Sequence, residues 1–173
     1  MTVKFPNTRT PMAPAPPMRG FFAIGAEGIS KAFNLGNMLR SAHAFGASFV
    51  FTIGAEPSLY EIRSTDTSDA PGHLPLYHHN TIDDLSLPVG CALVGVELLD
   101  DAVELPRFRH PLRAAYILGP ENGSLSPEVQ ARCDHTIIIP TRFCLNVGIA
   151  GALVMYDRLL ALGPYRETAR TLP

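Results

Sequence analysis

The chain has 173 residues, a length that fits a single domain and allows a buried hydrophobic core. With 46% hydrophobic and 17% charged residues, the composition is that of a globular protein and excludes a disordered chain. The formal net charge of −2 gives no general attraction to nucleic acid, so any such binding has to come from a local basic patch.

The cysteines and the N-terminal residues bear on the cellular compartment and on where the domain begins. The chain has three cysteines, Cys91, Cys133 and Cys144, which lack metal-ligand spacing. We therefore expect neither a metal site nor a disulfide scaffold, and we expect the protein to reside in a reducing cytoplasm. Residues 1–20 carry five prolines and no apolar core of a signal peptide, which predicts an extended tail ahead of a domain at 21–173. No apolar run is long enough for a membrane span.

Short aliphatic runs alternate with helical patterns along the rest of the chain. Residues 55–80, rich in Pro, Ser, Asp and His, are predicted as mostly loop, with room for one short helix. Strands are predicted at 21–26, 47–54, 91–98, 114–119 and 136–140, and helices at 34–46, 126–133 and 146–162. This alternation predicts a single α/β domain around a largely parallel sheet.

The helix "NLGNMLRSAHAFG" (34–46) contains the first candidate site. Its apolar residues recur at helical spacing, while Asn34 stands at the expected N-cap and Arg40 lies away from the apolar stripe. One interpretation is a capped amphipathic helix with a solvated arginine. The other makes Asn34 and Arg40 a polar pair that faces a substrate.

Two further stretches follow predicted strands, where ligands of open α/β sheets bind. "LGPENGSLSPE" (118–128) places Glu121 between Gly119 and Gly123, which allow tight turns and close backbone approach. "IPTRFCLNVGIAG" (139–151) opens the last helix with Asn146 and two glycines. Each glycine costs about 1 kcal/mol relative to alanine, so we expect close approach of another backbone or a ligand there. An ordinary turn and an ordinary cap remain the alternatives.

Together, in this order, the three stretches resemble the motifs of the SpoU/TrmH branch of the SPOUT methyltransferases. "NLGNMLR" is similar to N-x-G-x-x-x-R, "LGPENG" contains the G-x-E core, and "IPTRFCLNV" is similar to the family's I-P…S-L-N-V with Cys144 in place of serine. The resemblance covers residues 20–163. It implies a deep trefoil knot in the C-terminal part of the sheet, an exception to the rule that chains are unknotted.

The resemblance also implies an activity and the residues for it. We expect an obligate homodimer that transfers a methyl group from S-adenosylmethionine to a ribose 2′-hydroxyl of RNA, with tRNA favoured over rRNA because the domain is minimal. The implied catalytic residues are Asn34, Arg40, Glu121 and Asn146, with Arg40 reaching toward the partner subunit's cofactor. The implied cofactor-binding residues are Val96, Gly119, Pro120, Gly123, Ile139, Cys144, Leu145 and Asn146.

A basic segment, "RFRHPLR" (107–113), is the candidate RNA contact besides Arg40. It places Arg107, Arg109 and Arg113 around Phe108, a combination that suits phosphate binding and base stacking, although a solvated loop is an equal alternative. A second functional hypothesis is a non-catalytic RNA- or cofactor-binding module on the same fold. A Rossmann-type nucleotide enzyme is disfavoured because no G-x-G-x-x-G occurs in the chain.

Overall fold

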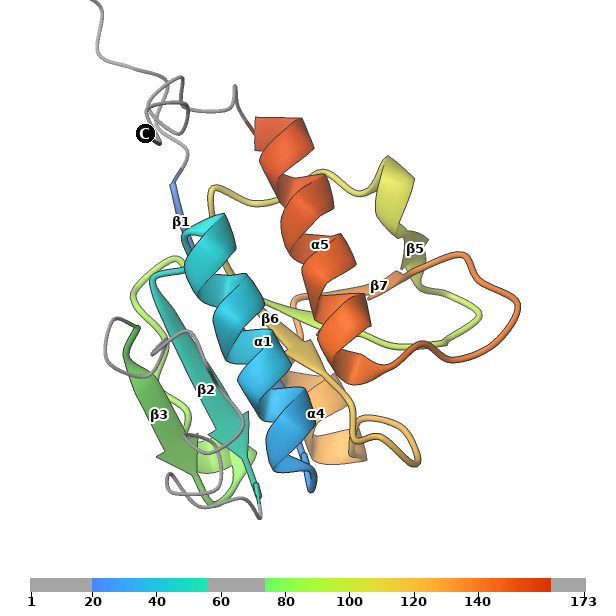
Figure 1. The fold of residues 1–173 in the computed structure, drawn as a ribbon. Coiled ribbons are helices and arrows are strands. Elements are labelled where there is room, and N and C mark those ends of the chain that lie inside the picture. The colour runs from blue at the N-terminus through green and yellow to red at the C-terminus, as the bar shows by residue number, and fades with distance from the viewer. Residues whose placement is uncertain (1–19, 56–73, 163–173) are drawn as a thin grey trace, which may run out of the picture.

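A computed structural model of the protein describes residues 20–55 and 74–162, and most of the predicted tail lies outside this part (Figure 1). Its strands form one seven-stranded sheet in which all the neighbouring strands are parallel. The prediction of an α/β domain with a largely parallel sheet is therefore confirmed. The strands are β1 (Phe21–Glu27), β2 (Phe49–Ile53), β3 (Leu76–His79), β4 (Ala92–Val96), β5 (Val103–Glu104), β6 (Arg113–Leu118) and β7 (His135–Ile138).

Helices cover both faces of the sheet. Helices α1 (Ala32–Phe45) and α5 (Val147–Leu162) lie side by side on one face, and α4 (Pro127–Arg132) packs on the other with the 3-10 turn η1 (Ile82–Asp84) (Figure 1). A second 3-10 turn, η2 (Leu105–Arg107), follows β5. Because neighbouring side chains of a strand point to opposite faces, each strand contributes to both cores. Ile24, for example, packs under α1 and α5, and the adjacent Ala23 packs on the α4 side.

The strand order is β3-β2-β1-β6-β4-β7-β5. Strand β7 thus lies between β4 and β5, which directly follow one another among the strands of the chain. Since all strands run the same way, the carboxyl ends of β1, β4, β6 and β7 meet at one edge of the sheet. The segments that resemble family motifs leave the sheet at this edge.

Two local expectations need correction. Strand β3 lies in the segment predicted as loop, because "LYHH" at a sheet edge lacks the aliphatic run of a buried strand. Asn34 does not cap its helix: α1 begins after Lys31, which makes no side-chain cap bond, and Asn34 is 4% exposed within the first turn. Of the two glycines in α5, Gly148 lies near another backbone, as expected, whereas Gly151 lies against side chains. A β-carbon on Gly148 would lie 3.6 Å from the Asn34 carbonyl oxygen, and one on Gly151 would lie 3.1 Å from Ile24.

The three cysteines are free thiols. Within residues 20–55 and 74–162, no helix has both the length and the apolar character needed to cross a lipid bilayer.

Candidate functional site

A cleft opens at the edge where the strands end. It encloses about 600 Å³ of empty space, part of it continuous with solvent. Three strand ends, the loop after β6 and the start of α5 form its walls. Seven of the eight residues expected to bind a cofactor line it: Val96, Gly119, Pro120, Gly123, Ile139, Cys144 and Leu145. The remaining lining residues are Glu97, Leu98, Leu118, Glu121, Thr141, Val147 and Ala150.

A chain of side-chain hydrogen bonds joins three of the four residues expected to be catalytic. The Asn34 amide nitrogen donates to Glu121 Oε1 at 2.7 Å, and the Asn34 amide oxygen accepts from Asn146 Nδ2 at 3.0 Å. Asn146 Oδ1 accepts the backbone N–H of Gly148 at 2.9 Å and so caps α5. Asn34 therefore ties the loop after β6 to the start of α5, although 87 and 112 residues separate it from these partners.

Glu121 lies at the N-terminal end of α1, where the sequence placed Asn34 as the cap. Its carboxylate accepts from the Ser30 hydroxyl at 2.6 Å and from the backbone N–H groups of Ser30 and Lys31, both at 3.3 Å. A carboxylate at a helix N-terminus also meets the positive end of the helix dipole. Burial by itself raises the pKa of Glu121, but the hydrogen bonds from Ser30, Asn34 and Lys31 outweigh burial and lower the pKa below 4.5. Glu121 is thus an ionised carboxylate at neutral pH.

Arg40 lies outside the cleft. It borders a second hollow, the α1/α5 groove, together with Asn37, Ser41, Phe45, Asn146, Gly148, Ile149, Ala152, Leu153 and Tyr156. The first turn of α5 separates the two hollows: Val147 and Ala150 face the cleft, while Asn146 and Ile149 face the groove. Asn146, expected to bind cofactor, belongs to the groove side of this wall.

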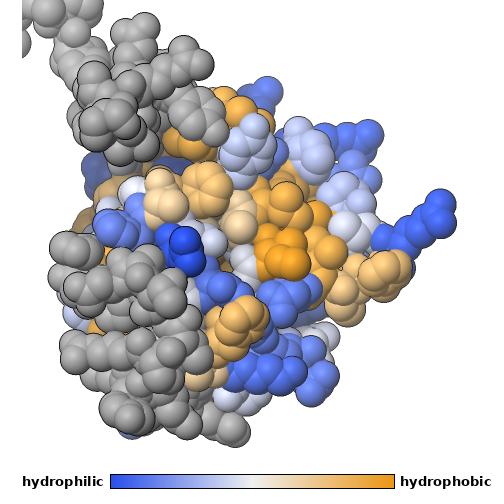
Figure 2. All heavy atoms as spheres, in the orientation of Figure 1, coloured by the Kyte–Doolittle hydropathy of each residue, from blue (hydrophilic) through white to orange (hydrophobic). Residues whose placement is uncertain are grey.

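The surface around the groove is apolar. Figure 2 shows an extended hydrophobic area over α5 in the view of Figure 1. Its exposed members from α5 are Ile149, Leu153, Tyr156 and Leu160, which are 40–57% exposed. Large exposed apolar patches with a charged residue at their border are typical of protein interfaces.

The basic segment 107–113 is not at the cleft. Arg113 begins β6, and the cleft begins at Leu118, about 16 Å further along the strand at about 3.3 Å per residue. Phe108, expected to stack on bases, is instead partly buried, with its ring centroid 5.6 Å from that of His135 at the start of β7. Arg107 pairs with Glu104 at 3.3 Å, and Arg113 donates to the Val89 carbonyl. Phe108 is therefore not the exposed ring that base stacking needs, while contact of Arg107, Arg109 and Arg113 with RNA stays a prediction.

Sequence reasoning missed two exposed residues beside the cleft. Arg142 and Phe143 lie in the loop between β7 and α5, directly before Cys144, and Phe143 is 76% exposed. The Thr141 hydroxyl donates to the carbonyl oxygens of Ile139 and Phe143, which fixes the backbone of this loop. The adjacent Arg-Phe pair, between the predicted strand and the last predicted helix, was the feature of the sequence that could have indicated an RNA contact here.

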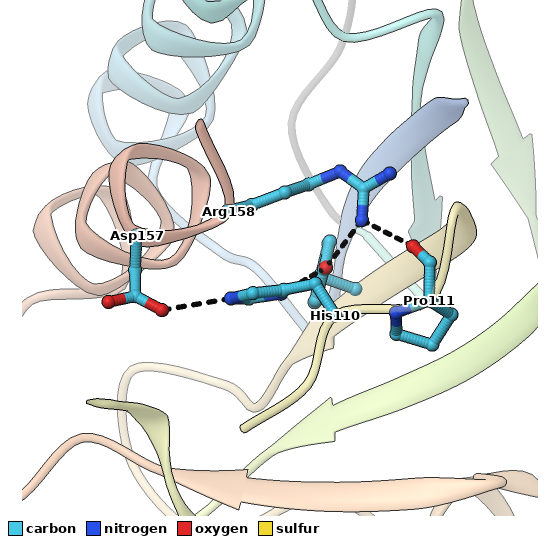
Figure 3. Close-up of polar contacts among 5 residues, drawn as sticks. His110, Pro111, Asp157 and Arg158 are labelled. Atoms are coloured by element: carbon cyan, nitrogen blue, oxygen red, sulfur yellow. Dashed lines mark hydrogen bonds and ion pairs between the residues drawn. The ribbon is translucent and has the colours of Figure 1, made fainter. Parts of the chain in front are cut away.

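A buried polar cluster lies away from the cleft, between α5 and the segment before β6 (Figure 3). His110 contacts Asp157 at 2.9 Å through Nε2 and the Tyr116 hydroxyl at 2.6 Å through Nδ1. The Arg158 guanidinium donates to that hydroxyl and to the carbonyl oxygens of Pro111, Leu112 and Phe21. Burial raises the pKa of Tyr116 to about 12, so its hydroxyl stays protonated.

The cluster defines the protonation of His110. Because Arg158 donates to the Tyr116 oxygen, the hydroxyl proton is directed to His110 Nδ1, and His110 Nε2–H donates to Asp157. Burial lowers the pKa of His110, and this effect outweighs the opposing attraction of Asp157. His110 is therefore neutral, and the basic segment is anchored to α5 by its inward-facing residues.

The geometry of the cleft and the order of the motifs agree with a comparison against protein-family models. The model of the SpoU rRNA Methylase family matches residues 22–156, nearly all of the described domain. The chain belongs to the SpoU rRNA Methylase family.

The curated relatives of the chain include tRNA methyltransferases. The tRNA (guanosine(18)-2'-O)-methyltransferase of Escherichia coli K12 is 25% identical over 137 residues, which cover 76% of this chain and 59% of the relative. The chain thus spans about three-fifths of the length of this curated relative.

Solved structures support the fold. The SpoU methyltransferase AviRb from Streptomyces viridochromogenes, in complex with the cofactor AdoMet, superposes with a TM-score of 0.71 at 21% identity, covering 84% of this chain and 58% of that one. A structure that concerns the 2-OH methylation of C/U34 on tRNA gives a TM-score of 0.70 at 24% identity, covering 83% of this chain and 97% of that one.

Proposed function

We propose that the protein is an S-adenosylmethionine-dependent RNA methyltransferase that methylates a ribose 2′-hydroxyl, in tRNA rather than rRNA. The observation that carries the proposal is the cleft, because seven of the eight residues that family resemblance assigned to the cofactor line one hollow. Family membership and the tRNA 2'-O-methyltransferase among the relatives support the reaction class.

The cleft fits the cofactor in chemical character. Leu98, Leu118 and Leu145 give an apolar lining for a nucleoside and an alkyl chain. Gly119 leaves room for the wall behind this lining, because a β-carbon there would lie 3.1 Å from the Leu125 nitrogen and 3.3 Å from Glu97 Oε2. The two charged residues among the described lining are Glu97 and Glu121, which suit a ligand of positive charge. When bound, the cofactor supplies a methyl group that its sulfonium already activates.

The chain's main task is then to hold the ribose oxygen in line with that methyl group. Alignment of two reactants lowers the activation barrier by about 7–11 kcal/mol. A positioned base raises the rate by about 10²–10⁴-fold, which corresponds to a smaller lowering of the barrier. Arg40 is a cation rather than a base, because a guanidinium stays protonated at neutral pH. We assign Arg40 to the phosphate beside the reacting ribose and to the negative charge that develops on the oxygen.

Asn34, Glu121 and Asn146 act as positioning residues in this proposal. Their polar atoms are engaged with one another and with the backbone at the starts of α1 and α5. They hold in place the wall between the cleft and the α1/α5 groove, which carries the cleft residues Val147 and Ala150. Arg142 and Phe143, exposed beside the cleft, are candidates for contact with the RNA backbone and a base.

We further infer a homodimer formed through the α1/α5 groove. The apolar side chains of Ile149, Leu153 and Tyr156 there are exposed in the single chain, and a second copy would bury them. Arg40 borders the groove and does not line the cleft of its own chain, which supports a role at the partner's cofactor.

A deep knot is also part of the proposal. Strand β7 pairs with β4 on one side and β5 on the other, although the chain runs from β4 to β5 and then to β6 before it reaches β7. The segment after β6 therefore enters a space that residues 97–112 already border. This arrangement supports the trefoil knot implied by the family.

The proposal is tested by methyl transfer to bulk tRNA and to rRNA, with labelled S-adenosylmethionine and mapping of the modified ribose. We expect Arg40→Ala to abolish transfer while cofactor affinity is kept, because Arg40 does not line the cleft. Arg40→Lys should recover little, since a point charge does not replace a bidentate fork. The matched comparison is Arg107→Ala, an exposed arginine that lines neither the cleft nor the groove, which should raise KM for RNA at most and leave kcat unchanged.

Mixing two inactive variants tests the shared site. Arg40→Ala and Asn146→Ala place their defects in different subunits of the proposed composite site, so their heterodimer should regain one working site. Heterodimers as inactive as both parents would refute the action of Arg40 across the dimer. Cofactor binding without transfer to either RNA would instead favour a non-catalytic binding module.

A further inference from the structure

Glu97 is a cleft residue that the family resemblance did not assign. It directly follows β4 and lies between Val96 and Leu98, both of which line the same cleft. Its carboxylate holds two backbone N–H groups: Oε1 accepts from Leu98 at 2.8 Å, and Oε2 accepts from Leu125 at 2.7 Å. These bonds fix the carboxylate in the cleft wall, next to Gly119, where a β-carbon would lie 3.3 Å from Glu97 Oε2.

The carboxylate of Glu97 retains capacity for a ligand. An ionised carboxylate has about four acceptor sites, and Glu97 uses two of them. Glu121, the other acid of the cleft, accepts from four donors at the N-terminus of α1, so its charge is already matched by that helix end. Among the described residues, Glu97 forms no ion pair, and the described cleft lining contains no basic side chain.

The charge of this wall distinguishes the two forms of the cofactor. Methyl transfer forms a bond between the ribose oxygen and the methyl carbon, breaks the bond between that carbon and sulfur with the electron pair left on sulfur, and releases the hydroxyl proton to solvent. The cofactor therefore enters with a positive sulfonium and leaves as a neutral thioether of almost the same shape. Apolar walls bind both forms alike, whereas an unpaired carboxylate favours the cation, and this attraction is strengthened where water is excluded.

We propose that Glu97 is the residue that makes the cleft select S-adenosylmethionine over the demethylated product S-adenosylhomocysteine. The proposal rests on the proposed function, because it assumes that the cleft is the cofactor site. Its consequence is that product leaves readily, since the interaction that favours the substrate form disappears with the transferred methyl group. Uniform binding of both forms would instead hold the product in the cleft.

The test is calorimetric titration of the full chain with S-adenosylmethionine, S-adenosylhomocysteine and sinefungin, a close analogue with a protonated amine near the sulfonium position. The wild-type protein should bind both cations more tightly than the neutral product. In Glu97→Gln we expect both cations to bind about tenfold more weakly, a change of about 1.4 kcal/mol, and the product to change less than about twofold. Glu97→Asp, which keeps the charge, should retain part of the preference.

The matched control is Glu128→Gln, which removes the same charge from an exposed residue of α4 outside the cleft and should leave all three affinities unchanged. A loop damaged by loss of the Leu125 hydrogen bond would weaken all three ligands equally. Equal weakening, or an unchanged preference, overturns the role of Glu97 and leaves the proposed function standing. Absence of binding of every ligand to the wild type overturns the proposed function and this inference with it.

Discussion

Replacement of Arg158 by methionine tests how much the buried cluster stabilises the fold. The Arg158 side chain comes from α5, is 3% exposed, and donates to three carbonyl oxygens and the Tyr116 hydroxyl at 2.6–3.3 Å. Its guanidinium carbon also lies 5.3 Å from the centre of the Phe22 ring. Methionine fills much of the same volume but donates no hydrogen bond, so it isolates the polar contribution.

The expected cost of Arg158→Met is about 3–5 kcal/mol, the usual range when one partner of a buried charged network is removed. Each carbonyl left without a donor costs about 1–3 kcal/mol. Part of this total cost is offset, because the variant no longer has to bury a charged guanidinium. This is a large share of the roughly 5–15 kcal/mol that stabilises a typical domain.

Urea unfolding followed by circular dichroism gives the free energy of unfolding by linear extrapolation. Arg142→Met, at an exposed loop position, is the matched control and should change that free energy by no more than about 0.5 kcal/mol. A loss below about 1 kcal/mol in Arg158→Met would refute the reasoning, because it would mean that the desolvation of the charge cancels its hydrogen bonds.

Three further predictions concern single sites. Burial lowers the pKa of His110 in the folded state, so below the unfolded value of about 6.5 the unfolded chain binds more protons than the folded chain. The stability that depends on neutral His110 should therefore be full above this pH and fall as the pH drops toward the folded pKa. Urea midpoints measured across pH should show this dependence, and His110→Gln should lose it. Gly25→Ala should lower stability by about 1–3 kcal/mol, because its β-carbon would lie 2.6 Å from both the ring and the carbonyl oxygen of Phe51, and an unchanged Tm would contradict this. Cys144→Ser should keep cofactor affinity, measured by calorimetry, since the exposed Cys144 thiol only borders the cleft.

The sequence predicted the elements that carry strong local signals. The aliphatic runs around Ile24, Val94 and Ile117 are strands, because β-branched and aliphatic side chains suit a sheet buried on both faces. Asn146 caps α5 as its position before the helix suggested. The residues that line the cleft were implied by the family resemblance, and they lie where ligand sites of parallel sheets form, at the carboxyl ends of the strands.

Apart from β3, whose sequence lacks the aliphatic run of a buried strand, the failures involve partners distant in the sequence. Asn34 looks like a cap, but it lies inside α1, and its side chain donates to Glu121, 87 residues away. Phe108 and His110 look like surface groups beside arginines, yet Asp157 and Tyr116 draw His110 inward. No periodicity in the last helix indicates that Arg158 is buried, because its acceptors lie on the segment before β6 and on β1. Pairings of this kind depend on tertiary structure, which local patterns do not contain.

The place of β7 in the sheet also determines when, during synthesis, the cleft becomes complete and able to bind cofactor. Translation delivers β1, β4 and β6 well before β7 and α5 emerge from the ribosome. The cleft needs Ile139, Cys144 and Ala150 from this last part of the chain, so a nascent chain that stops before it has only half of the cleft walls. A prematurely terminated product would therefore expose an incomplete sheet edge and bind no cofactor, and ligand binding would stabilise the finished chain alone.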